Sequence, residues 1–275
     1  MAKRMNEAEV TAMLKKKIDE GQVLFMPNCG CGLTAKLQEA GGADLICLSA
    51  TSYWRMKGQG SLSPMMPYSD INKIILDLAP EVVANIQNAP ILAQVGATNP
   101  LLPHEKILKE LWDAGVSGIN PFMMNIYGSE IMEQMAQIDM GWDKEVDMVA
   151  MAHHMNMFAL EYAFTPDEAR ILAEVGCPAI SSHVGSTVGG LKGAKTKITL
   201  EEATELSQQI FDAAKAVNPD IILFAHGGPM KGPEEAQYVV RHTDAHGFIG
   251  GSAAERIPIE KAIIAATKEY KEITK

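Results

Sequence analysis

Three titratable side chains stand at the ends of consecutive apolar runs in the second half of the chain. Glu161 lies at the end of one run, His183 follows the next, and His226 follows the one after that. Histidine titrates near neutral pH, and the pKa of a glutamate can be raised toward neutral pH. The three side chains could therefore form a general acid–base set. Two histidines and a carboxylate are also a ligand set for a divalent metal. In a third interpretation one or more of them only hydrogen-bonds neighbouring loops, and the sequence leaves all three open.

Glycine-rich segments follow the same runs and suit an anion. They lie at 185–190, 226–229 and 250–256. Barrel proteins that bind phosphate do so with the loops after their seventh and eighth strands, through bare amide N–H groups, and glycine lets the anion approach. We expect the amides around Gly228 and at 250–252 to be the main donors, with Arg256 less directly involved. Together with polar residues at earlier run ends, the predicted substrate- or anion-binding residues are Gly30, Ser49, Asn120, Gly189, Gly190, Gly227, Gly228, Gly250, Gly251 and Ser252.

Arg55 is the candidate cation of this site. It lies in a connection, 51–69, that is longer than a turn and a helix need. Cleavage through an enolate needs a cation or hydrogen-bond donors near the developing charge, and Arg55, His183, His226 or a bound metal could supply it. The predicted catalytic residues are therefore His183, His226, Glu161 and Arg55. The cofactor stays unknown, with a divalent metal on Glu161, His183 and His226 as one candidate.

Eight short apolar runs are positioned to carry these residues. They lie at 23–26, 45–48, 91–95, 118–122, 158–162, 179–182, 221–225 and 247–250. Their length and continuous hydrophobicity are typical of strands buried on both faces, and amphipathic helical segments lie between them. Eight alternations predict one (β/α)8 TIM barrel over 1–275, preceded by a helix at about 6–20. The alternative is an open doubly wound sheet, but no GxGxxG follows the first run.

Composition restricts the class of partner. The 275 residues carry a formal net charge of −10, which argues against nucleic acid, and no window is apolar enough for a membrane span. The N-terminus lacks the apolar region of a signal peptide, and four cysteines form no disulfide framework, so we expect a cytoplasmic protein. The methionine-rich segment 123–157 is more apolar than a solvated excursion should be, which predicts a homo-oligomer.

Several segments resemble a family described as phosphoenolpyruvate hydrolase-like. The matching motifs lie at 30–36, 41–46, 55–61, 183–190, 226–229 and 247–258, and the resemblance runs in order from about residue 20 to 265. It also extends to the C-terminal barrel domain of a plant antiviral resistance protein. The resemblance implies a barrel related to phosphoenolpyruvate mutase and isocitrate lyase, usually oligomeric. That larger group holds Mg²⁺ with acidic residues at strand ends, whereas the third run here ends in Gln94 and is followed by no carboxylate.

The leading functional hypothesis is an enzyme, a hydrolase or a lyase, that acts on a small anionic metabolite. Its substrate would be an enol phosphate, a phosphonate or an oxo-carboxylate, and the reaction would be hydrolysis or cleavage of a C–C or P–C bond through an enolate. One alternative is a metal-dependent C–C lyase that uses Glu161, His183 and His226. A second alternative is a non-catalytic ligand-binding or signalling barrel.

Overall fold

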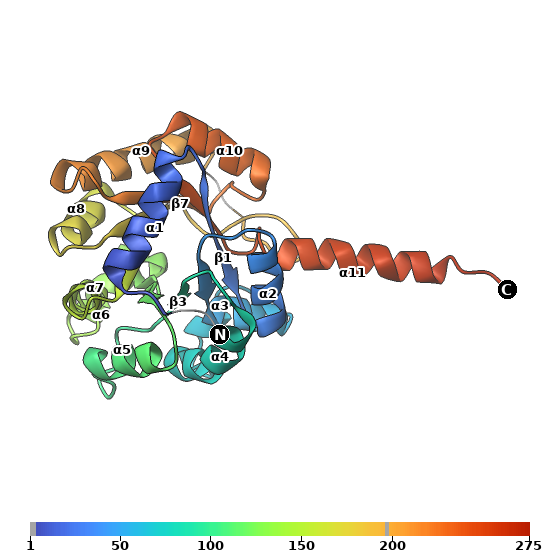
Figure 1. Ribbon diagram of the computed structural model, residues 1–275, viewed down its shortest axis with the longest axis horizontal. Coiled ribbons are helices and arrows are strands. Elements are labelled where there is room, and N and C mark those ends of the chain that lie inside the picture. Colours follow the sequence, from blue (N-terminus) through green and yellow to red (C-terminus); the bar gives the residue numbers. More distant parts are fainter. Residues whose placement is uncertain (1–3, 196–197) are drawn as a thin grey trace.

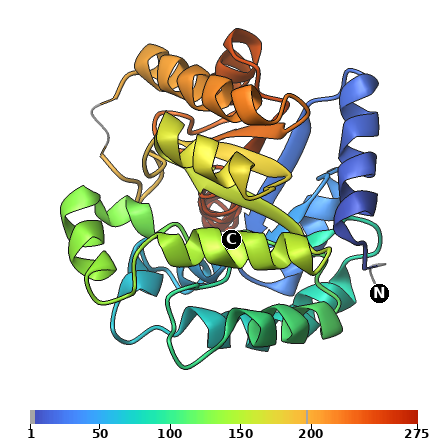
Figure 2. The ribbon, with the colours of Figure 1, turned by 90° about the vertical axis from the view of Figure 1, so that its left-hand side faces the viewer.

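The computed structural model describes residues 4–195 and 198–275, and shows a closed barrel of eight parallel strands in the order of the sequence. Residues 196 and 197, which belong to the glycine-rich connection after the sixth strand, lie outside the described residues. Figures 1 and 2 show helices surrounding the strands. The predicted barrel is confirmed, and the open sheet is excluded because the last strand, β8, pairs with the first, β1.

The strands fall at the eight predicted positions. They are β1 Leu24–Cys29, β2 Ile46–Leu48, β3 Ile91–Ala93, β4 Gly118–Ile119, β5 Phe158–Ala163, β6 Ala179–His183, β7 Ile222–His226 and β8 Gly247–Gly250. β3 and β4 are shorter than the sequence predicted, whereas β6 and β7 each extend by one residue to a histidine. His183 and His226 are therefore fixed by the backbone of the barrel.

Helices follow each strand. They are α1 Glu7–Asp19, α2 Gly32–Ala40, α3 Ala50–Met56, α4 Ile71–Asn85, α5 His104–Asp113, α6 Ser129–Ala136, α7 Asp143–His154, α8 Pro166–Glu174, α9 Leu200–Val217, α10 Pro233–His242 and α11 Arg256–Lys271. Two 3-10 turns, η1 Ser63–Met65 and η2 Met124–Tyr127, lie in the long connections. The long connection after β2 thus begins with the short helix α3, which carries Arg55.

The local signals that start and end helices act as the sequence suggests. Thr199 caps α9 in a capping box with Glu202. Gly42, Gly115 and Gly176, each shortly before a strand, have positive φ angles, which glycine adopts without the steric cost that a Cβ would impose.

Side-chain alternation divides the buried residues into two layers. Along β5, Leu160 and Tyr162 face the barrel interior, while Ala159 and Ala163 face the surrounding helices. Val10 and Leu14 of α1 pack with the interior layer, so α1 closes one end of the barrel (Figure 1). No helix in the described chain is both long and apolar enough to cross a membrane.

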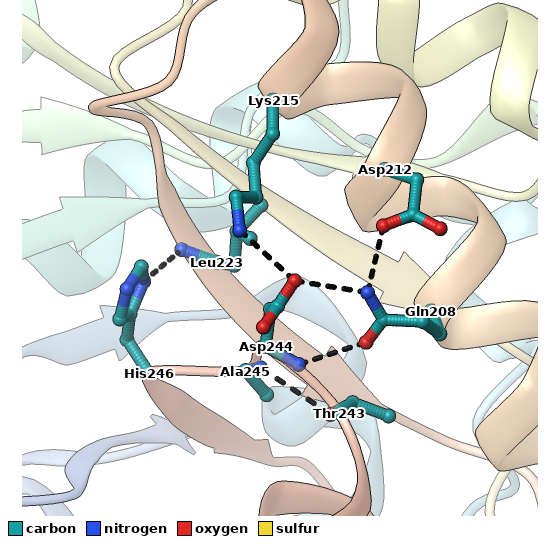
Figure 3. A network of polar contacts seen from close by, with 8 residues as sticks. All are labelled: Gln208, Asp212, Lys215, Leu223, Thr243, Asp244, Ala245 and His246. Atoms are coloured by element: carbon teal, nitrogen blue, oxygen red, sulfur yellow. Dashed lines mark hydrogen bonds and ion pairs between the residues drawn. The ribbon is translucent and has the colours of Figure 1, made fainter.

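A polar network ties the turn before β8 to α9 (Figure 3). Asp244 accepts hydrogen bonds from Gln208 Nε2 at 2.9 Å and from Lys215 Nζ at 3.0 Å. Its own amide donates to Gln208 Oε1 at 2.8 Å. These donors hold the pKa of Asp244 below its usual value. The network lies at the amino ends of β7 and β8, opposite the end that carries His226. It therefore stabilises the barrel and leaves the carboxyl ends of the strands free for function.

Candidate active site

The two histidines lie side by side at the carboxyl ends of neighbouring strands. His183 and His226 are register partners, and their ring centroids are 5.0 Å apart. The Tyr162 ring lies 5.2 Å from each of them. Phe164 stacks on His183 at 4.3 Å. Aromatic contacts therefore fix both imidazoles in place.

Their hydrogen bonds place the two protons differently. His226 Nδ1 lies 2.8 Å from the carbonyl oxygen of Ile249, which can only accept, so Nδ1 carries the proton and Nε2 keeps its lone pair. His183 Nδ1 instead accepts a bond of 3.2 Å from the amide of Gly185, so its neutral ring carries the proton on Nε2. One ring can accept a proton through Nε2 and the other can donate a hydrogen bond through Nε2.

Burial keeps both rings neutral at physiological pH. It lowers the pKa of His226 to about 4, and the charge of Arg55 acts in the same direction. Burial, followed by the neighbouring His226, holds the pKa of His183 well below its usual value. The complementary arrangement of one acceptor and one donor therefore persists at neutral pH.

Arg55 brings a buried positive charge to the same place. Its Nη1 donates to Ser252 Oγ at 2.9 Å and its Nη2 to Ser52 Oγ at 2.6 Å, while Nε meets no acceptor among the described residues. Burial lowers the pKa of Arg55 to about 10, against the opposing effect of Glu255, so the guanidinium stays charged. A buried cation bonded to hydroxyls, with an unused N–H, is suited to receive an anion.

One cavity connects these groups. Its polar wall contains Asn28, Thr51, Arg55, His183, His226, Gly251 and Ser252, and its apolar wall contains Leu62, Met65, Phe122, Met123 and Ile126. A Cβ at Gly251 would lie 3.3 Å from His226 Cε1 and 3.4 Å from Arg55 Nη1, so glycine leaves the space where these two groups meet. Across the described ranges, the amides of Gly251 and Ser252 donate to no acceptor. They remain candidates for anion binding, as does Ser252 Oγ.

The glycines after β7 pack against the loop after β6. The amide of Gly228 donates to the carbonyl oxygen of Gly185 at 2.7 Å, so this amide is not free to bind the anion as predicted. A Cβ at Gly227 would lie 2.2 Å from the same carbonyl oxygen. Gly227 and Gly228 let the loop after β7 pack against the loop after β6, which positions His183 and His226.

Three other predicted anion-binding residues form hydrogen bonds with other groups of the protein. The Gly30 amide donates to Glu255 Oε1 at 2.8 Å. Ser49 caps α3 and donates to Gln94 Oε1 at 2.9 Å. Asn120 donates to the carbonyl of Leu160 at 2.7 Å. Their side chains or amides hold the site's framework together and do not line the cavity.

The glycines of the 185–190 segment lie against a second arginine. The Gly189 carbonyl accepts from Arg256 Nη2 at 3.0 Å, and a Cβ at Gly190 would lie 2.3 Å from Arg256 Nη1. Arg256 also pairs with Glu260 at 2.7 Å. The guanidinium of Arg256 is therefore held by the Gly189 carbonyl and by Glu260. Gly250 packs against Phe25 and Ala254, and it does not line the cavity either.

Glu161 does not join the histidines. Tyr162, its neighbour along β5, faces the barrel interior, so Glu161 points to the surrounding helices. Its Oε1 accepts the amide of Tyr162 at 2.7 Å, and Oε2 has no partner in the described chain. Burial, followed by the nearby Glu145, raises the pKa of Glu161 well above its usual value. The predicted convergence of Glu161, His183 and His226 is wrong because strand alternation separates them.

The described residues do not fit a magnesium ion. No cluster of three or more His, Cys, Asp or Glu side chains that could hold a metal occurs within 4–195 and 198–275. At the end of β3 stands Gln94, whose Oε1 accepts from Ser49 and Thr51 hydroxyls at 2.9 and 3.3 Å. Mg²⁺ is usually bound through one or two carboxylates, which a neutral amide does not replace. Arg55 is the positive charge that the described chain brings to this cavity.

Two residues beside the site were given no role from the sequence. Tyr162 contacts both histidine rings, and Glu255 accepts from the Gly30 amide and from Thr34 Oγ1 at 2.7 Å. Glu255 lies in the segment 250–256, which the sequence predicted to bind an anion through its backbone amides. Tyr162 stands beside Glu161 in the fifth apolar run, and the strand period of two puts these two side chains on opposite faces.

The protein is thus a (β/α)8 barrel that carries a buried arginine and a pair of histidines at its mouth. The chain belongs to the phosphoenolpyruvate hydrolase-like family, whose model matches residues 9–273. The tomato (Solanum lycopersicum) ToMV resistance protein Tm-1(GCR237) is 41% identical over 263 residues, which are 95% of this chain and 35% of that protein. The chain thus spans about a third of that relative's length.

Solved structures of related folds are more distant in sequence. A phosphonopyruvate hydrolase in complex with oxalate and Mg²⁺ has a TM-score of 0.60 at 14% identity, over 94% of this chain and 84% of that chain. An oxaloacetate acetylhydrolase has a TM-score of 0.61 at 14% identity, over 95% and 87%. These structures share the overall fold of this chain.

Proposed function

We propose that this protein is an enzyme that cleaves a small anionic metabolite, an enol phosphate, a phosphonate or an oxo-carboxylate, through an enolate. The observation that carries the proposal is the cavity in which a buried Arg55 adjoins two neutral histidines of opposite tautomer. Arg55 would bind the carboxylate, phosphate or phosphonate of the substrate, assisted by Ser252 and the free amides beside it. The electrostatic attraction between such a cation and an anion is stronger in a buried site than in water.

The histidines divide the proton chemistry between them. His226 Nε2 would take a proton from the attacking water or from a substrate hydroxyl. His183 Nε2–H would donate a hydrogen bond to the enolate oxygen as charge develops there. Apolar residues over the cavity, including Met65 and Phe122, exclude bulk water from these groups.

The relatives support the same class of substrate. The distant structures are named for phosphonopyruvate and for oxaloacetate, both small anionic oxo acids. Glu161 takes no part in the proposal, because it points away from the cavity.

The test combines turnover with binding. The full chain is incubated with a panel of enol phosphates, phosphonates and oxo-carboxylates, and release of phosphate or of an oxo acid is followed. Binding of oxalate, a stable enolate mimic, is measured by calorimetry for the wild type, for Arg55→Met and for the control Arg170→Met, which lies on the exposed side of α8. We expect at least a tenfold loss of oxalate affinity in Arg55→Met and none in the control.

The name of the tomato relative favours a second candidate, a barrel that binds a ligand without converting it. In that case oxalate would bind in an Arg55-dependent manner while no member of the panel is turned over. If oxalate binding is absent, or is the same in Arg55→Met, the assignment of the anion site fails.

A further inference from the structure

The cavity of the candidate active site has an apolar wall that takes no part in the proposed proton chemistry. Leu62 and Met65 come from the connection after β2, and Phe122, Met123 and Ile126 come from the connection after β4. These five side chains offer no strong hydrogen-bond donor or acceptor. A ligand in the cavity therefore meets polar groups on one wall and hydrocarbon on the other.

The closed barrel places the connection after β4 across the mouth from the anion-binding groups. β4 is the fourth strand from β8 in either direction around the barrel, so this connection lies opposite Gly251 and Ser252, which follow β8. The two histidines end β6 and β7, which lie between β4 and β8 around the barrel. A substrate whose anionic group binds at Arg55 and Ser252, and whose reacting atoms face the histidines, therefore points its remaining end toward the apolar wall.

The two connections that form the apolar wall are held together. Tyr127 Oη donates to the carbonyl oxygen of Met65 at 3.3 Å, which joins the connection after β4 to the one after β2. Phe122 packs with Met124 and Met132 in a small core of its own, and Met65 packs against the same core. The wall is therefore supported from behind and keeps its shape as one surface.

Such a wall distinguishes a charged group from an alkyl group. A carboxylate beside it would lose its hydration without gaining a hydrogen-bond donor. An alkyl chain would instead leave water for an apolar surface, and each buried methylene strengthens binding about fourfold. The cavity has a free volume of about 40 Å³, so an added methylene would touch the wall. The flexible methionine side chains can shift to admit a longer chain.

We propose that the substrate carries an alkyl chain of two or more carbons at the end remote from its anionic group. The substrate class is then a 2-oxo acid with such a chain, or an enol phosphate or phosphonate with the same chain. The assignment rests on the proposed function, because it requires the anionic group to bind at Arg55. Met65 and Phe122 become the specificity-determining residues, and an oxo acid with a second carboxylate at its far end is rejected.

Two oxo acids of equal length provide the direct test. Binding of pyruvate, 2-oxobutanoate, 2-oxopentanoate and 2-oxoglutarate to the full chain is measured by calorimetric competition against oxalate. 2-Oxopentanoate and 2-oxoglutarate have the same number of carbons, and one ends in a methyl group where the other ends in a carboxylate. We expect the affinity to rise about tenfold from pyruvate to 2-oxopentanoate, and 2-oxoglutarate to bind about tenfold more weakly than 2-oxopentanoate.

Met65→Gln tests the wall itself. Glutamine has nearly the length of methionine but presents a polar amide to the alkyl chain, so the ratio of the pyruvate Kd to the 2-oxopentanoate Kd should fall to about twofold or less. Leu62→Gln, at a position that is 52% exposed and contributes little to folding, should also lower this ratio. Met66→Gln is the matched control, because Met66 is exposed and does not line the cavity, and it should keep the wild-type ratio.

The outcomes separate the alkyl assignment from the anion site. The alkyl assignment fails, and the anion site stands, if oxalate binds in an Arg55-dependent manner while the alkyl chain adds no affinity. It also fails if 2-oxoglutarate binds as tightly as 2-oxopentanoate, or if Met65→Gln and Leu62→Gln both keep the wild-type ratio. If oxalate does not bind at all, the anion site fails and the alkyl assignment fails with it.

Discussion

At the scale of single residues, His226, the proton acceptor of the histidine pair, has an unusually low pKa for a general base. His226 donates Nδ1–H to a carbonyl and is buried, so the pKa of its ring falls to about 4. A base with this pKa is a weaker acceptor than a free histidine, but it is fully neutral across the physiological range. Arg55 and His183 would then supply most of the stabilisation of the developing charge.

The pH profile of turnover follows from this value. With the active substrate, kcat/KM should stay level from neutral pH down to about pH 5 and fall only near pH 4, where His226 gains its proton. His226→Gln should lower kcat by about 10²- to 10⁴-fold and remove that acid limb. Steady-state kinetics from pH 3.5 to 8 measure both effects, and an acid limb near pH 6.5 would contradict the assignment.

The same pKa affects folding stability. Because the folded pKa lies below the unfolded one, the unfolded chain binds the proton first as the pH falls. The contribution of His226 is complete above about pH 6.5 and declines down to about pH 4, by roughly 3 kcal/mol in total. Denaturant unfolding should therefore show a smaller loss of stability between pH 7 and 4.5 in His226→Gln than in the wild type.

Glu161 leads to the opposite dependence. Its folded pKa is raised, so as the pH rises above about 4.5 the unfolded chain ionises first and stability is lost. Glu161→Gln cannot ionise, so its gain in Tm over the wild type should grow from pH 5 to pH 8 while turnover stays unchanged. Glu130→Gln, at an exposed position on α6, is the control and should show no such trend. A large loss of kcat in Glu161→Gln would return Glu161 to the catalytic set.

At the scale of elements, the loops after β6 and β7 act as one unit. Gly227 has a φ of 91°, and its Cα lies against the carbonyl of Gly185, whose amide in turn bonds His183. A side chain at Gly227 would therefore disturb both histidines through the backbone.

Gly227→Ala tests this coupling. The added methyl would clash with the Gly185 carbonyl, and positive φ adds strain, so we expect a loss of about 1–3 kcal/mol together with a lower kcat. Gly58→Ala has a similar φ of 76° and nothing within 4 Å of the new methyl, so it isolates the conformational cost. Equal kcat values in the two variants would show that the contact does not position the histidines.

The elements were more predictable than the side chains they present. Short, continuous apolar runs are local signals, and they placed the eight strands correctly. β5 is buried along its whole length, so hydrophobicity does not distinguish the face of Tyr162 from that of Glu161. The sequence also could not show that a carbonyl of another loop already occupies the Gly228 amide, or that Glu255 reaches Gly30 across 225 residues. Such contacts depend on the closed barrel.

At the scale of the whole molecule, the barrel keeps stability and function at opposite ends. The cavity and its loops lie at the carboxyl ends of the strands, while α1 and the Asp244 network lie toward the amino ends. Changes at the amino end should therefore alter stability without altering the chemistry.

Leu14→Ala tests this separation. Leu14 of α1 is fully buried with Val10, Leu24 and Met26 at the closed end of the barrel. Its truncation should lower the free energy of unfolding by about 2–5 kcal/mol, because it removes apolar contacts and leaves a cavity. Below the new Tm, kcat and KM should match the wild type. Lys16→Ala, on the exposed side of the same helix, should change stability by less than about 0.5 kcal/mol. A Leu14→Ala variant with normal stability but altered KM would mean that α1 communicates with the cavity through the core.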